Sequence, residues 1–294
     1  MTPRNANEYV TTDLAIESVV KDKAKGIEYE ERDEDGFSVA VMRVKDGRGA
    51  ETVGRPVGNY VTVTIGRPWL FDDEQTEKAE ELLSREISAL AKKMSPCGSV
   101  LVVGLGNRGL TADSLGPGVT DGLLVTRHIK YRDEDLFRSL GQAEMSSFSP
   151  GVLGQTGIET LELVRGAVER VKPDLVVAVD ALAARGVDRL ATTVQLCDTG
   201  LSPGSGVGNT REAINQSSLG VPVLAVGAPT VVNSATLVRD ALSLAGTEEI
   251  SPELEAVLEN GRSFFVSLKE SDVAVTELSR IISRAINRAF RTDG

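Results

Sequence analysis

Two aspartates, Asp113 and Asp180, follow apolar stretches that predict buried β-strands. Asp180 comes directly after the stretch 175–179, and Asp113 follows the stretch 99–104 after a glycine-rich loop. In an open parallel sheet, ligands and chemistry collect at the carboxyl ends of the strands. Two carboxylates brought together there can share one proton and activate a water molecule, because like charges at close range cannot both stay ionised. The pair therefore predicts a hydrolytic dyad, although an aspartate after a strand is also a common N-cap.

The number of histidines limits the competing chemistry. The chain of 294 residues has one histidine, His128, so neither a three-histidine nor an HExxH zinc site can be built. A Ser-His-Asp triad would need His128, which lies in the apolar run 123–129 and is expected to be a strand residue. We therefore expect neither a metal nor another cofactor.

Charge and cysteine content indicate the setting. Lys and Arg number 32 against 43 Asp and Glu, and the net charge of -11 disfavours binding to nucleic acid. Only two cysteines, Cys97 and Cys197, are present, which favours a reducing cytoplasm over a disulfide framework. The N-terminus lacks the apolar region of a signal peptide, and no run reaches the roughly 18 apolar residues of a membrane helix. We expect a cytoplasmic protein.

The pattern of apolar residues predicts an α/β fold. Two alternating stretches, 37–44 and 60–65, are expected to pair as an antiparallel hairpin ahead of the core. Further strands are expected over 100–104, 123–129, 175–179, 192–197 and 221–226, and helices over 72–94, 155–171, 232–245 and 270–291. Strands that alternate with helices indicate a sheet covered on both faces. One compact domain with an N-terminal extension is the simplest organisation.

Two short motifs suggest other functions. The stretch 104–109 matches GxGxxG after a strand, as in dinucleotide-binding enzymes. Gly116-Pro117-Gly118 interrupts the helix that would receive the pyrophosphate, and no acidic residue ends the next predicted strand. The tripeptide 198–200 is the Asp-Thr-Gly of pepsin-like proteases, but it occurs once and in an α/β pattern. We expect it to form a turn that helps to shape a site.

Several blocks taken together resemble the germination protease family (the spore protease, or GPR endopeptidase) of spore-forming bacteria. The resemblance extends from about residue 10 to about residue 245, in order and in spacing. The blocks that carry it are 104–107, 111–117, 150–160, 180–185, 198–209 and 227–233. Two departures occur, because Ala112-Asp113-Ser114 replaces the family's usual Pro-Asp-Ala and Asn233 stands where an Asp is common. Neither changes the aspartate pair.

The resemblance implies an activity and a setting. The family degrades the small acid-soluble proteins of dormant spores when the spore germinates. Its fold is similar to the hydrogenase maturation proteases, which implies a three-layer sandwich with a mostly parallel sheet, an N-terminal extension and a β-hairpin. The family is a cytoplasmic homotetramer of the spore core, is made as a zymogen and has no cofactor. An aspartic mechanism is favoured for it, and the matching positions here are Asp113 and Asp180.

The N-terminal segment 12–17, Thr-Asp-Leu-Ala-Ile-Glu, resembles the processing site of that family. We therefore expect cleavage between Ala15 and Ile16, which divides the chain into a propeptide, 1–15, and a single protease domain, 16–294.

Candidate substrate-binding residues are Arg185 and the glycine-rich loop with Gly204, Ser205 and Gly206. Three alternatives remain open. The first is a metal-dependent peptidase of the hydrogenase-maturation type, which would use carboxylates with His128. The second is a dinucleotide-binding enzyme, and the third is a binding protein without catalysis.

Overall fold

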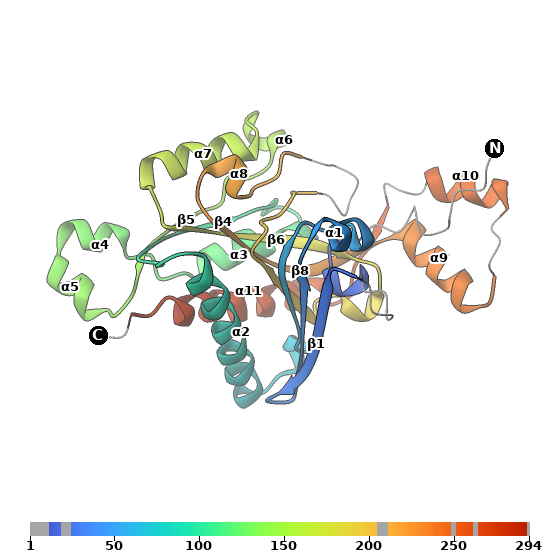
Figure 1. Ribbon diagram of the computed structural model, residues 1–294, viewed down its shortest axis with the longest axis horizontal. Coiled ribbons are helices and arrows are strands. Elements are labelled where there is room, and N and C mark those ends of the chain that lie inside the picture. Colours follow the sequence, from blue (N-terminus) through green and yellow to red (C-terminus); the bar gives the residue numbers. More distant parts are fainter. Residues whose placement is uncertain (1–11, 19–24, 205–210, 248–250, 261–263, 293–294) are drawn as a thin grey trace.

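A computed structural model describes residues 12–18, 25–204, 211–247, 251–260 and 264–292. These residues form a layered α/β structure around one mixed sheet (Figure 1), whose strands follow the order β1-β2-β3-β7-β8-β6-β4-β5, with β9 paired to β8. The strands are β1 (Ile27–Glu34), β2 (Phe37–Val44), β3 (Gly58–Thr64), β4 (Ser99–Gly104), β5 (Glu144–Phe148), β6 (Leu175–Ala184), β7 (Thr193–Cys197), β8 (Val223–Asn233) and β9 (Phe265–Val266). The predicted α/β class is confirmed.

The sheet has a parallel half and an antiparallel half. β5, β4, β6 and β8 are parallel to one another, and β8 then pairs with β7 in the antiparallel sense. β7, β3, β2 and β1 continue antiparallel to the edge. The predicted hairpin is β2–β3, and it joins the main sheet through β7. The parallel half is the part that brings the carboxyl ends of β4 and β6 to the same edge.

Helices cover both faces, as predicted. One face carries α2 (Asp73–Met94), α3 (Leu115–Asp121) and α11 (Ser271–Ala289), and the other carries α7 (Thr160–Val171) and α8 (Gln216–Leu219) (Figure 1). α2 begins with a capping box in which Asp72 and Gln75 bond each other's backbone N–H, so its predicted start is confirmed. The remaining helices are α1 (Gly47–Val53), α4 (Arg127–Arg132), α5 (Glu134–Ser139), α6 (Leu153–Thr156), α9 (Ser234–Leu244) and α10 (Pro252–Asn260).

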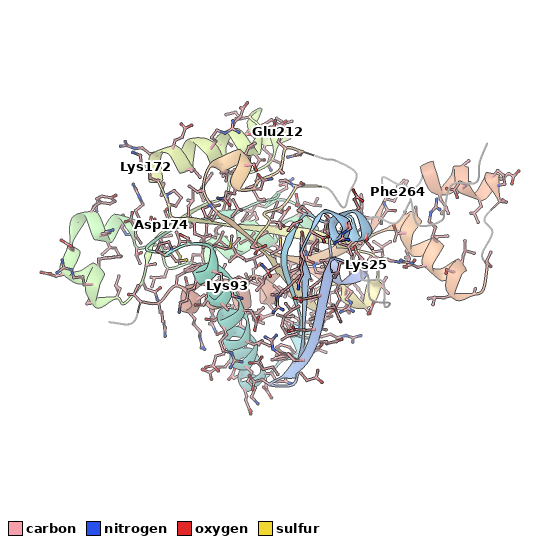
Figure 2. The ribbon with its side chains drawn as sticks, viewed as in Figure 1. Lys25, Lys93, Lys172, Asp174, Glu212 and Phe264 are labelled. Atoms are coloured by element: carbon pink, nitrogen blue, oxygen red, sulfur yellow. The ribbon has the colours of Figure 1, made fainter. Side chains whose placement is uncertain are left out.

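The two faces of the sheet bury separate apolar clusters. The larger cluster packs α2 and α11 against side chains such as Val177 and Val179 of β6, and the smaller packs α7 against Val176 and Ala178. This alternation follows from the two-residue period of a strand. At the edge where the parallel strands begin, the Asp174 carboxylate accepts the Ser99 N–H at 2.9 Å and joins the starts of β4 and β6 (Figure 2).

Four predicted elements differ in the structure, and one of them is β8, which was predicted over 221–226 and extends from Val223 to Asn233. The run 123–129 is not a strand, because the Thr126 hydroxyl bonds the backbone on both sides of Glu144 and α4 begins at Arg127. The predicted helix 155–171 is divided, since Gly157 ends α6 with φ of 71° and α7 begins at Thr160. β6 continues five residues beyond its predicted end, because β8 remains paired with it as far as Ala184.

Candidate active site

Asp180 lies within β6 rather than after it. Its backbone is opposite Gly227 of β8, and only 6% of the residue is exposed. The alternation along β6 places Asp180 on the face covered by α7. Its Oδ1 accepts the N–H of Ala181 at 2.9 Å. The strand therefore holds this carboxyl in a fixed position inside the protein.

Asp113 comes from a separate element and is only partly buried. It ends a single 3₁₀ turn, Thr111–Asp113, between β4 and α3. Its Oδ2 accepts the N–H of Asn107 at 2.9 Å, and the Thr230 hydroxyl of β8 donates to the Ala112 carbonyl at 2.5 Å. The turn is thus fixed both to the loop that leaves β4 and to the strand beside β6.

The glycines of the GxGxxG motif allow this approach. Gly106 has φ of +114°, and a Cβ there would lie 2.1 Å from the Asp113 carbonyl oxygen. A Cβ on Gly104 would lie 2.2 Å from the carbonyl oxygen of Gly116 in α3. Side chains at these positions would push away the turn that carries Asp113 and the helix that follows it. The motif therefore has a structural purpose that needs no dinucleotide.

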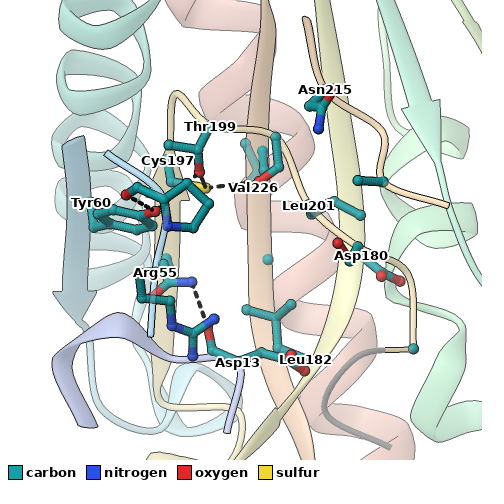
Figure 3. A pocket seen from close by; sticks show the side chains of 18 of the residues that line it. Asp13, Arg55, Tyr60, Asp180, Leu182, Cys197, Thr199, Leu201, Asn215 and Val226 are labelled. Carbon is teal, nitrogen blue, oxygen red and sulfur yellow. Dashed lines mark hydrogen bonds between the residues drawn. The ribbon is translucent and has the colours of Figure 1, made fainter. Parts of the chain in front are cut away.

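The two aspartates open into one cavity. A cavity of about 500 Å³ is lined by Asp113 and Asp180, together with Asp13 and Arg211. A smaller cavity of about 300 Å³ is also lined by Asp13 and Asp180. Figure 3 shows this smaller cavity, with Tyr60 on the opposite wall. A peptide bound across both cavities would pass the two carboxyls.

The surroundings of Asp113 and Asp180 raise the pKa of both carboxyls. Burial raises the pKa of Asp180 well above its ordinary value, and the negative charges of Asp113 and Asp13 raise it further. Burial also raises the pKa of Asp113, against the opposing effects of the Asn107 N–H and the Arg211 guanidinium. Because the two carboxyls interact, they titrate as a pair. Such a pair can hold one proton at neutral pH.

The predicted substrate-binding residues separate in the structure. Gly204 lines both cavities, and Ser205 and Gly206 lie outside the described residues. Arg185 lines neither cavity, because its guanidinium forms a bidentate pair with Asp240 of α9 at 2.7–2.9 Å. A role for its side chain in substrate contact gains no support.

The predicted processing segment is docked beside the dyad. Asp13 donates its N–H to the Ala183 carbonyl at 2.8 Å and accepts the Ala183 N–H through Oδ2 at 2.9 Å. The Gln195 side chain of β7 bonds the backbone on both sides of Leu14, with the Asp13 carbonyl at 2.9 Å and the Ala15 N–H at 2.5 Å. Asp13 lines the dyad cavity, whereas Ala15 and Ile16 do not.

The bond expected to be cut is covered in this state. Ala15 is fully buried and begins a 3₁₀ turn, Ala15–Ser18. The Glu17 carboxylate accepts the backbone N–H groups of Arg185 and Gly186 at 2.8 and 2.9 Å and fixes the far end of the turn. Cleavage between Ala15 and Ile16 therefore stays a prediction, and the segment must leave this position before the bond can be reached.

The Asp-Thr-Gly tripeptide forms a turn, as predicted. Asp198 accepts the backbone and side-chain N–H groups of Asn59 in β3 at 2.8 and 2.6 Å. Thr199 and Gly200 line the smaller cavity. The Thr199 hydroxyl donates to Tyr60 at 3.3 Å, and burial raises the pKa of Tyr60 to about 12. Asp198 thus supports the wall of the site and is not part of its carboxylate pair.

The metal-dependent alternative would need His128 close to the carboxylates. His128 lies exposed on α4 and lines neither cavity. No group of three His, Cys, Asp or Glu side chains suited to a metal ion occurs among the residues that the structure describes. In the same part of the chain, no helix has the length and apolar character needed to cross a bilayer.

Four residues of the site were not singled out from sequence for this role. Asp13, Gln195, Arg211 and Thr230 line the cavities or fix their walls. Asp13 and Thr230 belonged to recognised segments, the processing-site segment 12–17 and the block 227–233, but without a role in the site. Gln195 and Thr230 lie inside apolar strands, where one buried polar side chain was the available signal.

The family follows from comparison with known proteins. The family model described as Germination protease matches residues 5–248. This chain belongs to the germination protease family. The germination protease of Caldanaerobacter subterraneus subsp. tengcongensis is 39% identical, over 96% of this chain and 94% of that protein. The germination protease of Bacillus subtilis is 42% identical, over 80% and 67% respectively.

The family makes the chain a protease of spore germination. Among solved structures, it is similar to a [NiFe] hydrogenase maturation protease, HycI, from Thermococcus kodakarensis KOD1, with 18% identity and a TM-score of 0.33. That likeness covers 59% of this chain and 97% of the other.

Proposed function

We propose that this germination protease cuts small acid-soluble spore proteins in the spore core with Asp113 and Asp180 as an aspartic dyad. The observation that carries the proposal is one cavity that contains both carboxyls, each with a raised pKa. The segment 12–18 of the chain itself lies beside the cavity, with its backbone bonded to Ala183 of β6 and to Gln195 of β7. Two carboxyls in a cavity beside a site that binds peptide backbone are the parts that such a hydrolysis needs.

We assign different roles to the two carboxyls on the basis of their surroundings. Asp180 is the more deeply buried and faces two other acidic groups, so it holds the shared proton. Each carboxyl accepts one backbone N–H, but Asp113 is less buried, so Asp113 is the one that ionises first and acts as the base. Asp113 takes a proton from water while the water oxygen bonds to the scissile carbonyl carbon. Asp180 donates a hydrogen bond to the carbonyl oxygen.

The second half of the reaction returns both groups to their starting state. When the C–N bond breaks, the leaving nitrogen takes the proton from Asp113 and the carbonyl of the new carboxyl group re-forms. Asp180 keeps its proton, and a new water molecule completes the cycle. No cofactor takes part in this scheme.

Matched Asp→Asn variants test the dyad. D113N and D180N should lower kcat/KM on a small acid-soluble spore protein by at least about a thousandfold, because each removes a group that moves or holds a proton. D174N is the control, since Asp174 lies exposed at the opposite end of β6. Cleavage would be followed by mass spectrometry, and folding by circular dichroism. Folded D113N or D180N with full activity would exclude the dyad.

Zymogen processing needs its own experiment. We propose that the segment 12–18 undocks before the chain is cut between Ala15 and Ile16, because Ala15 is buried in the docked state. Intact-mass measurements during activation should show the loss of residues 1–15, and D180N should not process itself. Fully active protein that retains Met1, or a different new N-terminus, would contradict this site of cleavage.

The assembly is proposed as a homotetramer, in line with the family resemblance. Light scattering on the purified full chain gives its mass directly, and a monomer that cleaves its substrate at the full rate would contradict the proposal.

A further inference from the structure

Arg211 is a basic side chain in the dyad cavity to which the proposed mechanism assigns no role. It lies between Gly204 and α8 in the described chain, is partly buried and lines the larger cavity with Asp113 and Asp180. The structure gives it no hydrogen bond or ion pair with another described residue. Elsewhere, the Arg55 guanidinium donates to the Thr12 carbonyl, and the Arg185 guanidinium is held by Asp240. Arg211 thus differs from these neighbouring arginines.

The described charged side chains that line the larger cavity are acidic except for Arg211. The titratable groups that line the larger cavity are Asp13 from the N-terminal segment, Asp113 from the 3₁₀ turn, Asp180 from β6 and Arg211. Among the described residues lining this cavity, Arg211 is the one basic group. The smaller cavity adds Arg55, Tyr60 and Cys197 from the far wall. In the larger cavity, three carboxyls therefore share the lining with one guanidinium.

Burial acts against the dyad unless a cation compensates. It raises the pKa of both Asp113 and Asp180, and a bound peptide would exclude more water and raise both pKa values further. A pair with two protons has no base to activate water. The Arg211 guanidinium lowers the pKa of Asp113 and of Asp180, so its field reaches both carboxyls.

We propose that Arg211 is a positioning residue for the dyad, whose guanidinium keeps one of the two carboxyls ionised so that the pair enters catalysis with one proton. This inference rests on the proposed dyad mechanism. It requires a positive charge at this position, and the guanidinium shape matters less. Lysine at position 211 should therefore retain more of the function than glutamine.

The pH dependence of cleavage separates this role from substrate binding or from a structural role. Removing a nearby cation raises the pKa of a carboxyl, so the acidic limb of kcat/KM against pH should move to higher pH in R211Q. At pH values below the limb, kcat/KM of R211Q should be about tenfold lower than that of the unchanged chain for each pH unit by which the limb moves. At pH values above the limb, the two values should approach each other. R211K should keep the limb close to its original position.

A matched control removes the same charge elsewhere. Arg165 lies exposed on α7, bonds the Ser218 carbonyl and lines neither cavity. R165Q should leave the limb in place. A limb that stays in place in R211Q, whether activity is unchanged or falls equally at every pH, would overturn the proposal. A fall that is equal at every pH would instead indicate contact with the substrate.

A second measurement does not depend on cleavage. Carbon-13 NMR of aspartate-labelled protein follows the carboxyl carbons during a pH titration, and the D113N and D180N variants assign the two signals. The midpoints should rise in R211Q and remain nearly unchanged in R211K and R165Q. A shift in a chain that cuts no peptide would support the inference while the proposed function fails. Cleavage by the dyad without a shift would overturn the inference alone, and R211M, which also removes the charge, replaces R211Q in both measurements if R211Q does not fold.

Discussion

Asp180 in β6 and Glu80 in α2 are both almost fully buried, with 6% and 3% of each residue exposed, but their surroundings have opposite charge. Glu80 lies between α2 and α11, where its two oxygens are 3.2 Å from Arg284 and 3.5 Å from Arg288. Asp180 faces the carboxyls of Asp113 and Asp13 and bonds the N–H of its own successor.

The difference shows what each carboxyl contributes. Glu80 is a buried carboxylate with cationic partners, and it is part of the packing between α2 and α11. Removal of one member of such an ion-pair cluster leaves charges of the other members uncompensated. A buried carboxyl that faces other acids is held in an unfavourable setting by the rest of the fold. Such settings are typical of functional sites, where stability is lost in exchange for a shifted pKa. The two residues should therefore respond in opposite ways to the same loss of charge.

The largest effect on stability is expected at Glu80. E80Q takes away the carboxylate that pairs with Arg284 and one of the three that pair with Arg288, which keeps Glu77 and Glu81. It should lower the free energy of unfolding at pH 7 by about 1–3 kcal/mol. Both arginines keep access to water, with 53% and 29% of their side chains exposed, so a larger loss is not expected. Urea denaturation gives the value.

The matched control lies on the same helix. Glu74 pairs with Lys78 at 2.6 Å on the exposed side of α2, and E74Q should change stability by less than about 0.5 kcal/mol. Peptide cleavage by E80Q should stay normal well below its unfolding transition. An E80Q variant as stable as the unchanged chain would remove the distinction between the two buried carboxyls.

An increase in stability is expected from D180N, the variant that should lose cleavage if the proposed dyad is correct. Asparagine keeps an oxygen for the Ala181 N–H and carries no charge. At neutral pH the variant should be more stable, by about 1.4 kcal/mol for every unit by which folding raises the pKa of the native carboxyl. Urea denaturation of D180N and D174N side by side measures the difference.

The direction in which the stability advantage of D180N changes with pH follows from the raised pKa of Asp180. Because folding raises the pKa of Asp180, the folded state binds the proton more tightly than the unfolded state does. The native aspartate therefore loses stability as the pH rises from the ordinary range of an aspartate through its higher folded pKa. The advantage of D180N should be greatest above that range and should disappear in acid, where both forms of the side chain are neutral. An advantage that is constant with pH would point to packing instead of charge.

The sequence predicted the parts of this fold whose signals are local. α2 was found from its apolar spacing and from its cap at Asp72, and β4 from a continuous apolar run. Asp113 and Asp180 were proposed because strand ends collect functional groups in parallel sheets, and the structure places both in one cavity, although β6 continues past Asp180. That extension depends on pairing with β8, which a local pattern does not contain.

The rest of the site depends on contacts between distant residues. Arg211 and Asp13 reach the cavity of Asp180 from segments far away in the chain. Arg211 has no local pattern that marks it, and the motif around Asp13 indicated a cleavage site and not a place in this cavity. Arg185 was selected because it lies near Asp180 in sequence, yet its partner is Asp240 of α9. The strand expected around His128 failed because the contacts of Thr126 with the start of β5 are tertiary.

The smallest effect on global stability is expected at a third buried side chain, Gln195. It is neutral, and its amide oxygen and nitrogen both form hydrogen bonds. Its amide bonds the Asp13 carbonyl and the Ala15 N–H, so Q195L should release the docked segment without disturbing the core. Loss of these bonds should speed hydrogen exchange at the Ala15 amide about tenfold, which corresponds to about 1.4 kcal/mol of local opening. The global free energy of unfolding should change by less than about 0.5 kcal/mol, because a buried leucine restores apolar contact.

Gln142 offers a matched control for this change. It is equally buried, with 7% exposed, but its Oε1 has no hydrogen-bond partner among the described residues. Q142L should leave exchange at Ala15 unchanged. NMR exchange rates for Q195L and Q142L would therefore separate a glutamine that holds the N-terminal segment from one that only fills space. Equal protection of the Ala15 amide in both variants would mean that the burial of Leu14 and Ala15 and the bonds of Asp13 and Glu17 to the chain around β6 hold the segment without Gln195.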